Sequence, residues 1–367
     1  MDRSKDALHR AALIFVQDLL RLAEGEHLLI YVDAGSDWTT ARAIQGSARQ
    51  IRARSEIYEL PANLELPEVL EELTHRIERG GYAAVCELSE RYFYPTKVWK
   101  RALQMGARIY SLGPLDKDAF TRCVGQVDHK LMYEYGLALR QALRQARVVR
   151  IVSKQGTDLQ FRLDPPGVAR RLLSRLRVSQ TAWVGLPSGM LRQGRNSTFL
   201  GGQLAFQGVP ETIAGTAVID THLWPPAGIG PLELPITITI RKGSVVEIAG
   251  PSADSKILSR WLDGKDKRIR HFCLGFHPRA TTPGSLMEVE RLFGCISVGI
   301  GKYPFHTDGI IKSPSIWLDD RMIEREGTPV EDDLSALGRE LIQSYHGSPG
   351  AAAACTACTP PGRNDEA

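Results

Sequence analysis

The sequence predicts an α/β domain followed by an α+β domain, and three observations support this prediction. Over residues 28–113 short apolar segments alternate with longer amphipathic ones, which is typical of βαβ units with a parallel, Rossmann-like sheet. From residue 148 onward the pattern changes to β-rich segments joined by tight turns, which favours antiparallel strands. The 367 residues are enough for about two domains.

The first domain is expected to span residues 1–147. After a helical opening, the expected strands are LLIYVD, EIYEL, YAAVCEL and ARIYSLG, and the expected helices between them lie at 37–53, 66–79 and 95–105. Leu131, Tyr135, Leu139 and Leu143 recur about every four residues, which predicts a long helix over 128–147. This helix would close the first domain.

The second domain is expected to span residues 148–346 and to be rich in antiparallel strands. Two β-rich stretches, 148–163 and 236–250, each contain a central turn with glycine and therefore predict hairpins. Helices are expected at 254–263 and 330–345. Residues 347–367 lack hydrophobic periodicity and predict a disordered tail, in which Cys355 and Cys358 form a pair of unassigned role.

Composition and charge exclude several classes of protein. Hydrophobic residues make up 43% and charged residues 24% of the chain, as in ordinary globular proteins. The formal net charge of +4 is too small to indicate a nucleic-acid or membrane partner. A charged N-terminus and the lack of a long apolar stretch favour a cytoplasmic protein. In agreement with this, four cysteines lie singly in apolar segments, as reduced thiols do: Cys86, Cys123, Cys273 and Cys295.

Common enzyme motifs are missing from the sequence. The loop after the first predicted strand, residues 33–37, has neither the glycine pattern of a dinucleotide site nor that of a P-loop. The chain also has no G-x-S-x-G nucleophile elbow and no H-E-x-x-H helix. A nucleotide cofactor, a serine hydrolase of that type and a zincin are therefore not supported.

The most informative group of residues lies late in the chain. His306 and Asp308 are two positions apart on an expected strand, so their side chains point to the same face. With His277 they would supply two imidazoles and one carboxylate. That set binds one divalent metal and suits Fe(II), although zinc or manganese can occupy it as well. Glu288 and Glu290 lie between these ligands and are candidate catalytic carboxylates.

The second half of the chain resembles the superfamily that joins the thermophilic aminopeptidase T metallopeptidases to the 2,5-dihydroxypyridine dioxygenases. The resemblance rests on four segments in the same order and rough spacing: KQGTDLQFRL; GGQLAFQGVPETIAGTAVID; ITITIRKGSVVEIAG; and GFHPRATTPGSLMEVERLFGCISVGIG running into HTDGIIKSPSIWLDD. The segment SERYFYPTKVWKRALQMGARIYSLG matches more loosely. The resemblance implies a metal-dependent enzyme and a homodimer.

Two departures from the superfamily pattern favour its dioxygenase-like branch. A glutamate is expected after the glycine pair, where this chain has Gln203, and a histidine is expected where it has Ser297. A two-metal peptidase needs enough charged ligands for both ions, so the loss of two makes a dinuclear site unfavourable. The loop from Lys302 to Phe305 is also shorter than the superfamily pattern.

Three hypotheses follow, and the first is a mononuclear non-haem Fe(II) dioxygenase that acts on a small aromatic or amide substrate. In this hypothesis Gln203 and Ser297 are neutral hydrogen-bonding groups near the metal, Glu288 or Glu290 supports a ligand imidazole, and Tyr94 contacts the substrate.

The alternatives use the same residues differently. A one-metal aminopeptidase or amidase would use Glu288 or Glu290 as general base toward metal-activated water. A protein whose site has decayed would instead bind a peptide without catalysis, for example in the biosynthesis of a modified peptide. The expected partners are accordingly a small molecule or a peptide and a second copy of the chain, with no nucleic acid and no membrane.

Overall fold

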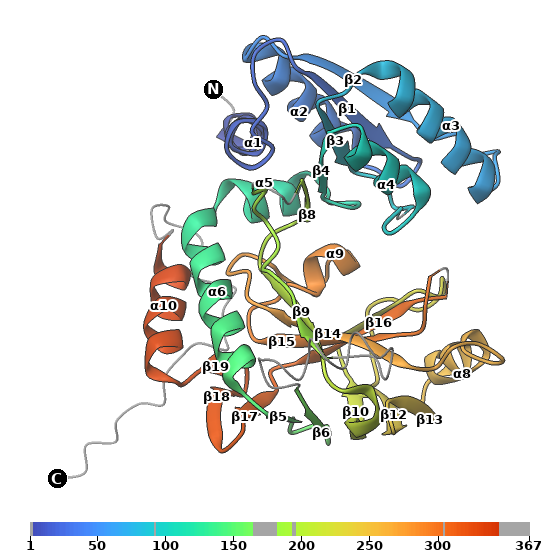
Figure 1. Cartoon of the computed structure of the whole chain (residues 1–367), viewed down its shortest axis with the longest axis vertical. Coiled ribbons are helices and arrows are strands. Elements are labelled where there is room, and N and C mark those ends of the chain that lie inside the picture. The colour runs from blue at the N-terminus through green and yellow to red at the C-terminus, as the bar shows by residue number, and fades with distance from the viewer. Residues whose placement is uncertain (1–2, 92, 164–181, 193–195, 304, 345–367) are drawn as a thin grey trace.

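The structure is a computed structural model with an N-terminal and a C-terminal unit (Figure 1). It describes residues 3–91, 93–163, 182–192, 196–303 and 305–344. The expected tail, with Cys355 and Cys358, lies outside these residues. Within the described part of the chain, no helix is long and apolar enough to cross a membrane.

The N-terminal unit is built on a five-stranded parallel sheet in the order β2-β1-β3-β4-β8, which confirms the predicted βαβ pattern. Its strands are β1 (His27–Val32), β2 (Arg54–Glu59), β3 (Ala84–Glu87), β4 (Arg108–Ser111) and β8 (Ser197–Phe199). Its helices are α1 (Arg3–Ile14), continued by a π-helical segment (Phe15–Leu19), α2 (Trp38–Gln50), α3 (Leu66–Gly80), α4 (Lys97–Gln104) and α5 (Lys117–Gly125).

Alternating side chains of this sheet enter two apolar layers, one on each face. On β1, Leu28 and Ile30 pack with α1, α2 and α5, whereas Leu29 and Tyr31 pack with α3 and α4. The continuous apolar character of the strands follows from this coverage on both faces.

The C-terminal unit contains two antiparallel sheets. The eight-stranded sheet has the order β13-β12-β10-β6-β5-β17-β18-β19, and the six-stranded sheet has the order β11-β16-β15-β14-β9-β7. The strands are β5 (Val148–Val152), β6 (Asp158–Arg162), β7 (Trp183–Val184), β9 (Gln203–Gln207), β10 (Ala214–Ile219), β11 (His222–Trp224), β12 (Ile236–Arg241), β13 (Ser244–Ala249), β14 (Ile269–Gly275), β15 (Cys295–Ile300), β16 (Thr307–Lys312), β17 (Ser315–Leu318), β18 (Arg321–Arg325) and β19 (Thr328–Pro329).

The two antiparallel sheets pack face to face around the largest apolar core. The ring of Phe161 on β6 stacks on that of Phe272 on β14 with centroids 4.5 Å apart. Helices cover the rest of the unit: α6 (His129–Gln145), a 3-10 turn (Pro210–Thr212), α8 (Ala253–Trp261), α9 (Leu286–Val289) and α10 (Asp332–Gln343). Of these, α6 and α10 pack against each other and against this core, at the left of Figure 1. By this packing α6 belongs to the C-terminal unit, whereas the sequence placed it at the end of the first domain.

Most predicted elements are confirmed. Both expected hairpins form, as the pairs β5/β6 and β12/β13. The long helix α6 begins after Asp128, whose carboxylate caps it by accepting a hydrogen bond from the Leu131 amide. The cysteines expected to be reduced are buried and free: Cys86, Cys123, Cys273 and Cys295.

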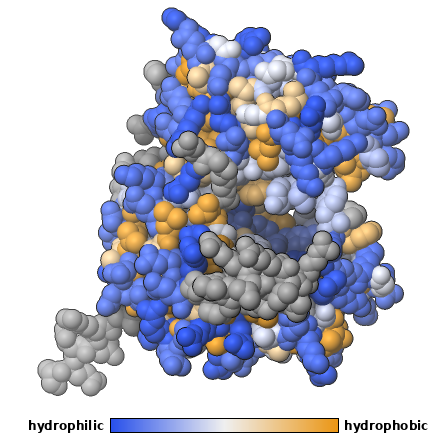
Figure 2. Space-filling view, in the orientation of Figure 1, coloured by the Kyte–Doolittle hydropathy of each residue, from blue (hydrophilic) through white to orange (hydrophobic). Residues whose placement is uncertain are grey.

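The chain crosses between the two units at a glycine pair. Strand β8, which belongs by sequence to the expected second domain, pairs with β4 of the first, and Gly201 and Gly202 then lead directly into β9. Gly202 has a left-handed φ of 89°, and a side chain there would meet the backbone of His277. Because β8 runs parallel to the other strands, the carboxyl edge of the parallel sheet faces the C-terminal unit. Helix α9 lies between the units in Figure 1, and Figure 2 shows the surface hollowed between them.

Candidate metal centre

One face of the six-stranded sheet carries polar side chains. Strand β14 alternates, so that Phe272 enters the core while His271 and Cys273 point the other way. Directly paired residues share a face, and Cys273 pairs with Ser297, while Gly299 pairs with both His271 and Asp308. The face turned away from the core therefore gathers an imidazole, a thiol, a hydroxyl and a carboxylate.

His271, His306 and Asp308 converge on this face. One ligand atom from each of the three residues lies within 4.8 Å of the others. Nε2 of His271 lies 3.0 Å from Oδ1 of Asp308, and Nε2 of His306 lies 2.9 Å from Oδ2 of the same carboxylate. Two imidazoles and a carboxylate at these distances match the donor set of a mononuclear Fe(II) site.

Two local features orient the imidazole rings. Nδ1–H of His306 donates a 2.9 Å hydrogen bond to the Gly301 carbonyl, which leaves Nε2 to face the carboxylate. A metal-binding histidine is commonly held in this way through its other ring nitrogen. The ring of His271 lies over Gly299, in space that a side chain at position 299 would fill.

The carboxylate and the imidazoles of the cluster shift one another's pKa values in the direction that favours their charged forms. Burial alone would raise the pKa of Asp308, but His306 and His271 outweigh it and hold this pKa well below its usual range. Burial would lower the pKa of His271, but Cys273 and Asp308 raise it well above the ordinary value. These shifts favour an ionised Asp308 carboxylate and favour retention of protons on the imidazoles beside it. Because a divalent cation needs deprotonated imidazoles, it would take the place of those protons.

His277 is not part of the cluster, so the ligand set predicted from the sequence needs a correction. Its fully buried ring donates from Nε2 to the Cys123 carbonyl at 2.9 Å and accepts at Nδ1 from the Arg279 amide at 3.1 Å. Both ring nitrogens are therefore used, and burial lowers the pKa of His277 to about 3. The residue lies beyond the end of β14 and contacts α5, so it joins the two units and His271 takes its place as the second imidazole.

The structure separates the two candidate carboxylates. Oε1 of Glu288 accepts hydrogen bonds from Arg122 of α5 and from the Thr281 amide, both at 2.8 Å. Glu290 instead interacts by charge with Asp308 and His271 of the cluster, and its pKa is raised, chiefly by burial. Glu288 therefore joins α5 to α9, whereas Glu290 faces the candidate metal centre.

Gln203 holds Glu290 in place. The Gln203 amide nitrogen donates to Oε2 of Glu290 at 2.8 Å, and its oxygen accepts from Nη2 of Arg291 at 3.2 Å. Because arginine can only donate, this contact fixes which end of the amide faces the glutamate. Gln203 and Glu290 were named from the sequence, whereas the fully buried Arg291 was not.

Ser297 and Tyr94 lie in different surroundings. The Ser297 side chain is fully buried on the polar sheet face, and within the described residues its hydroxyl has no hydrogen-bond partner. The Tyr94 ring is 42% exposed and packs edge-on against Trp99 and Phe199 of the N-terminal unit, each at 5.2 Å. Its contact with a substrate stays a prediction.

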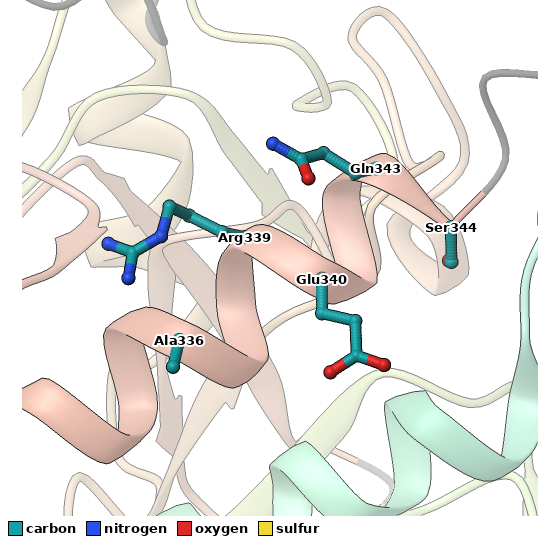
Figure 3. Close-up of a pocket in the computed structure, with 5 residues that line it drawn as sticks. All are labelled: Ala336, Arg339, Glu340, Gln343 and Ser344. Carbon is teal, nitrogen blue, oxygen red and sulfur yellow. The ribbon is translucent and has the colours of Figure 1, made fainter.

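A shallow cavity elsewhere has a different character. It follows one helix, α10, and its end, as Figure 3 shows, and is lined by Ala336, Arg339, Glu340, Gln343 and Ser344. These residues come from consecutive turns of a surface helix, and none belongs to the cluster of His271, His306 and Asp308. The cavity therefore lies apart from the candidate metal centre.

Comparisons with known proteins agree with the resemblance seen in the sequence. Among solved structures, the chain is similar to the 2,5-dihydroxypyridine dioxygenase of Pseudomonas putida KT2440, with a TM-score of 0.68, 19% identity, and coverage of 89% of this chain and 98% of that one. It is also similar to AmpT of Thermus thermophilus, with a TM-score of 0.59, 13% identity, and coverage of 89% and 100%. At these identities the likeness shows the fold. No curated protein matches the chain.

A family model decides the classification. The model of the 2,5-dihydroxypyridine 5,6-dioxygenases matches residues 14–289, which is well over half of the chain. The match ends at residue 289, so it includes His271 but not Glu290, His306 or Asp308. The grouping of these residues into one cluster therefore rests on the geometry of the structure. The chain belongs to the 2,5-dihydroxypyridine 5,6-dioxygenase family.

Proposed function

We propose that this protein is an Fe(II)-dependent ring-cleaving dioxygenase in which His271, His306 and Asp308 hold the metal. The observation that carries the proposal is the approach of two imidazole nitrogens and one carboxylate oxygen to within 4.8 Å of one another. The membership of a dioxygenase family supports the choice of reaction. Zinc and manganese accept the same donors, so the preference for iron rests on the family and on the ligand types together.

The donor set fits one divalent ion. Two neutral imidazoles and one carboxylate would leave a net charge of +1 on the loaded site. When bound, Fe(II) with such a set supplies open coordination positions for a substrate and for dioxygen. The Gly301 carbonyl keeps Nε2 of His306 directed at the site, and burial of Asp308 limits competition from water.

Glu290 is proposed to accept a proton from the substrate. Its raised pKa makes the carboxyl group more basic than an ordinary glutamate, and it faces the cluster. Gln203 and Arg291 hold its Oε2, which directs the group without leaving its charge unpaired. A ring hydroxyl that loses its proton becomes a better electron donor, so this step would prepare an electron-rich ring for oxidation.

The substrate class is proposed from the family and from the site together. A small hydroxylated heteroaromatic ring offers both an ionisable hydroxyl for Glu290 and electrons for oxidative cleavage. Tyr94 is the proposed contact from the N-terminal unit, because it lies in the loop after β3, at the edge of the parallel sheet that faces the C-terminal unit. Its exposed ring packs against Trp99 of α4 and Phe199 of β8.

The test is metal content and oxygen uptake, measured on the same preparations. Protein purified anaerobically and reconstituted with Fe(II) should contain about one iron per chain and consume oxygen with hydroxypyridines. His271→Ala and the pair His306→Ala/Asp308→Ala should contain none, whereas His75→Ala, an exposed histidine on α3, should match the parent. Release of amino acids from peptides or amides without oxygen uptake would replace the proposal by the hydrolase alternative, and parent protein that takes up no metal would end it.

A further inference from the structure

Gly299 lies between two of the proposed metal ligands. It is the direct partner of His271 on β14 and of Asp308 on β16, so the three residues form one row across three neighbouring strands. Strands are spaced about 4.8 Å apart, so the backbones of His271 and Asp308 are separated by about 10 Å. A side chain on the middle residue of the row would point to the same face and would stand between them.

The imidazole of His271 occupies the space above this glycine. A Cβ atom built on Gly299 would lie 2.4 Å from Cε1, 2.6 Å from Nε2 and 2.8 Å from Nδ1 of the ring. Since non-bonded carbon atoms pack at about 3.5–4.0 Å, a side chain at this position would force the ring to move from its place. His271 therefore crosses the middle strand directly over its backbone, and this path brings Nε2 to within 3.0 Å of Asp308.

The backbone does not by itself require glycine at this position. Gly299 is absent from the residues with positive φ, in contrast to Gly301 two positions later, whose φ is 76°. It pairs in regular register with β16, and its pairing with His271 on β14 lies beside a bulge at Arg270 of that strand, so its own extended backbone is one that alanine also adopts. The need for glycine thus comes from the ring above it.

We infer that Gly299 is a positioning residue of the metal centre, because its missing side chain is what allows His271 to reach the metal. The inference rests on the proposed function, because it assumes that His271 binds a metal. Gly299 would then be needed for the ligand set although it donates no atom to the metal. Any larger residue at 299 would push the imidazole off the row and leave His306 and Asp308 as an incomplete pair.

The test compares four variants of the full-length protein. They are Gly299→Ala, His271→Ala, the double variant His271→Ala/Gly299→Ala, and Gly46→Ala as control, since Gly46 lies in α2 with no other atom within 4 Å of an added Cβ. Two quantities are measured: the melting temperature of the metal-free protein, and affinity for Co(II) by titration of its visible absorption, checked with Fe(II) under anaerobic conditions. Neither readout depends on turnover.

The inference predicts a specific pattern. Gly299→Ala should weaken Co(II) affinity at least tenfold, the size of effect seen when groups that orient metal ligands are changed. It should also lower the melting temperature of the metal-free protein by several degrees, and this loss should largely disappear in the His271→Ala background, where no ring remains to clash. Gly46→Ala should change neither the affinity nor the effect of metal on stability.

The contrary outcomes are equally distinct. Parental Co(II) affinity in Gly299→Ala would overturn the inference, and so would an equal loss of stability with and without the His271 ring. If Gly299→Ala fails to fold, a folded double variant supports the clash and an unfolded one refutes it. Parent protein that binds no metal would instead refute the proposed function, while the comparison of metal-free melting temperatures would still decide whether Gly299 and His271 are coupled.

Discussion

Nε2 of His271 lies 3.0 Å from Oδ1 of Asp308, although a whole strand separates the two residues. His306 approaches the same carboxylate from only two positions away in the sequence. The candidate metal centre thus combines one local contact with one that depends on the pairing of three strands. Because the two contacts differ in this way, variants can distinguish the proposed metal ligands from nearby residues such as His277.

His271→Ala and His277→Ala should have opposite effects. Loss of the His271 imidazole should abolish metal binding and leave the fold intact. Loss of His277 should keep about one metal per chain and destabilise the protein by about 1–3 kcal/mol, because the buried Cys123 carbonyl and the Arg279 amide lose their partner. Elemental analysis and urea unfolding check both statements. The ligand assignment is wrong if His277→Ala is the variant without metal.

Glu290→Gln and Glu288→Gln should separate catalysis from stability. Glu290→Gln keeps the size of the side chain but removes the proposed proton acceptor, so kcat should fall by about 10²-fold or more at unchanged metal content. Glu288→Gln removes a charged partner of Arg122 and should cost about 1–3 kcal/mol of stability with kcat close to that of the parent. Steady-state kinetics with unfolding curves give the comparison. Equal losses of kcat in both variants would contradict it.

Gln203→Ala should impair the proposed proton transfer to Glu290 indirectly. Glu290 would lose the 2.8 Å hydrogen bond that directs it, so kcat should fall by about tenfold and the pH profile of kcat should shift. Gln203→Glu should be worse, because a second carboxylate beside Glu290 makes one of the pair retain a proton. A pH profile identical to that of the parent in both variants would show that Gln203 has no such role.

Stability should fall as pH rises, because of a buried carboxyl group outside the site. Burial raises the pKa of Glu324 on β18 to about 8, from an ordinary value of 4.5. The folded protein therefore keeps this proton between about pH 4.5 and 8, whereas the unfolded chain loses it, so rising pH favours unfolding across this window. The side chain can contribute up to about 1.4 kcal/mol per pH unit within it.

Glu324→Gln provides the check, since glutamine has the same shape and no titration. Melting temperatures at intervals from pH 5 to pH 8 should decline less in the variant than in the parent. Glu87, whose pKa is raised to about 7 by burial at the carboxyl edge of the parallel sheet, acts in the same direction and should account for part of the remaining slope. Parallel curves for the parent and for Glu324→Gln would show that Glu324 does not contribute.

Much of the fold could be predicted because its signals are local. The βαβ alternation, the two hairpins and the α6 helix depend on residue spacing and on turn residues such as Gly156 and Gly243, all read within short windows. The return of β8 to the parallel sheet could not be predicted in this way. Its three residues pair with β4, which lies far away in the sequence, and carry no distinctive pattern of their own.

The sequence by itself determined that His306 and Asp308 lie together, because residues two apart on an extended segment share a face whatever surrounds them. It also determined which residues depart from the family pattern, Gln203 and Ser297. Only the tertiary structure decided between His271 and His277. The two histidines are only six residues apart, at or just after strand β14. Strand pairing places His271 over Gly299 and beside Asp308. His277 lies beyond the end of the strand and binds the backbone of α5. Neighbours brought together by strand pairing are not encoded in sequence spacing, and the identity of the second imidazole depends on those neighbours.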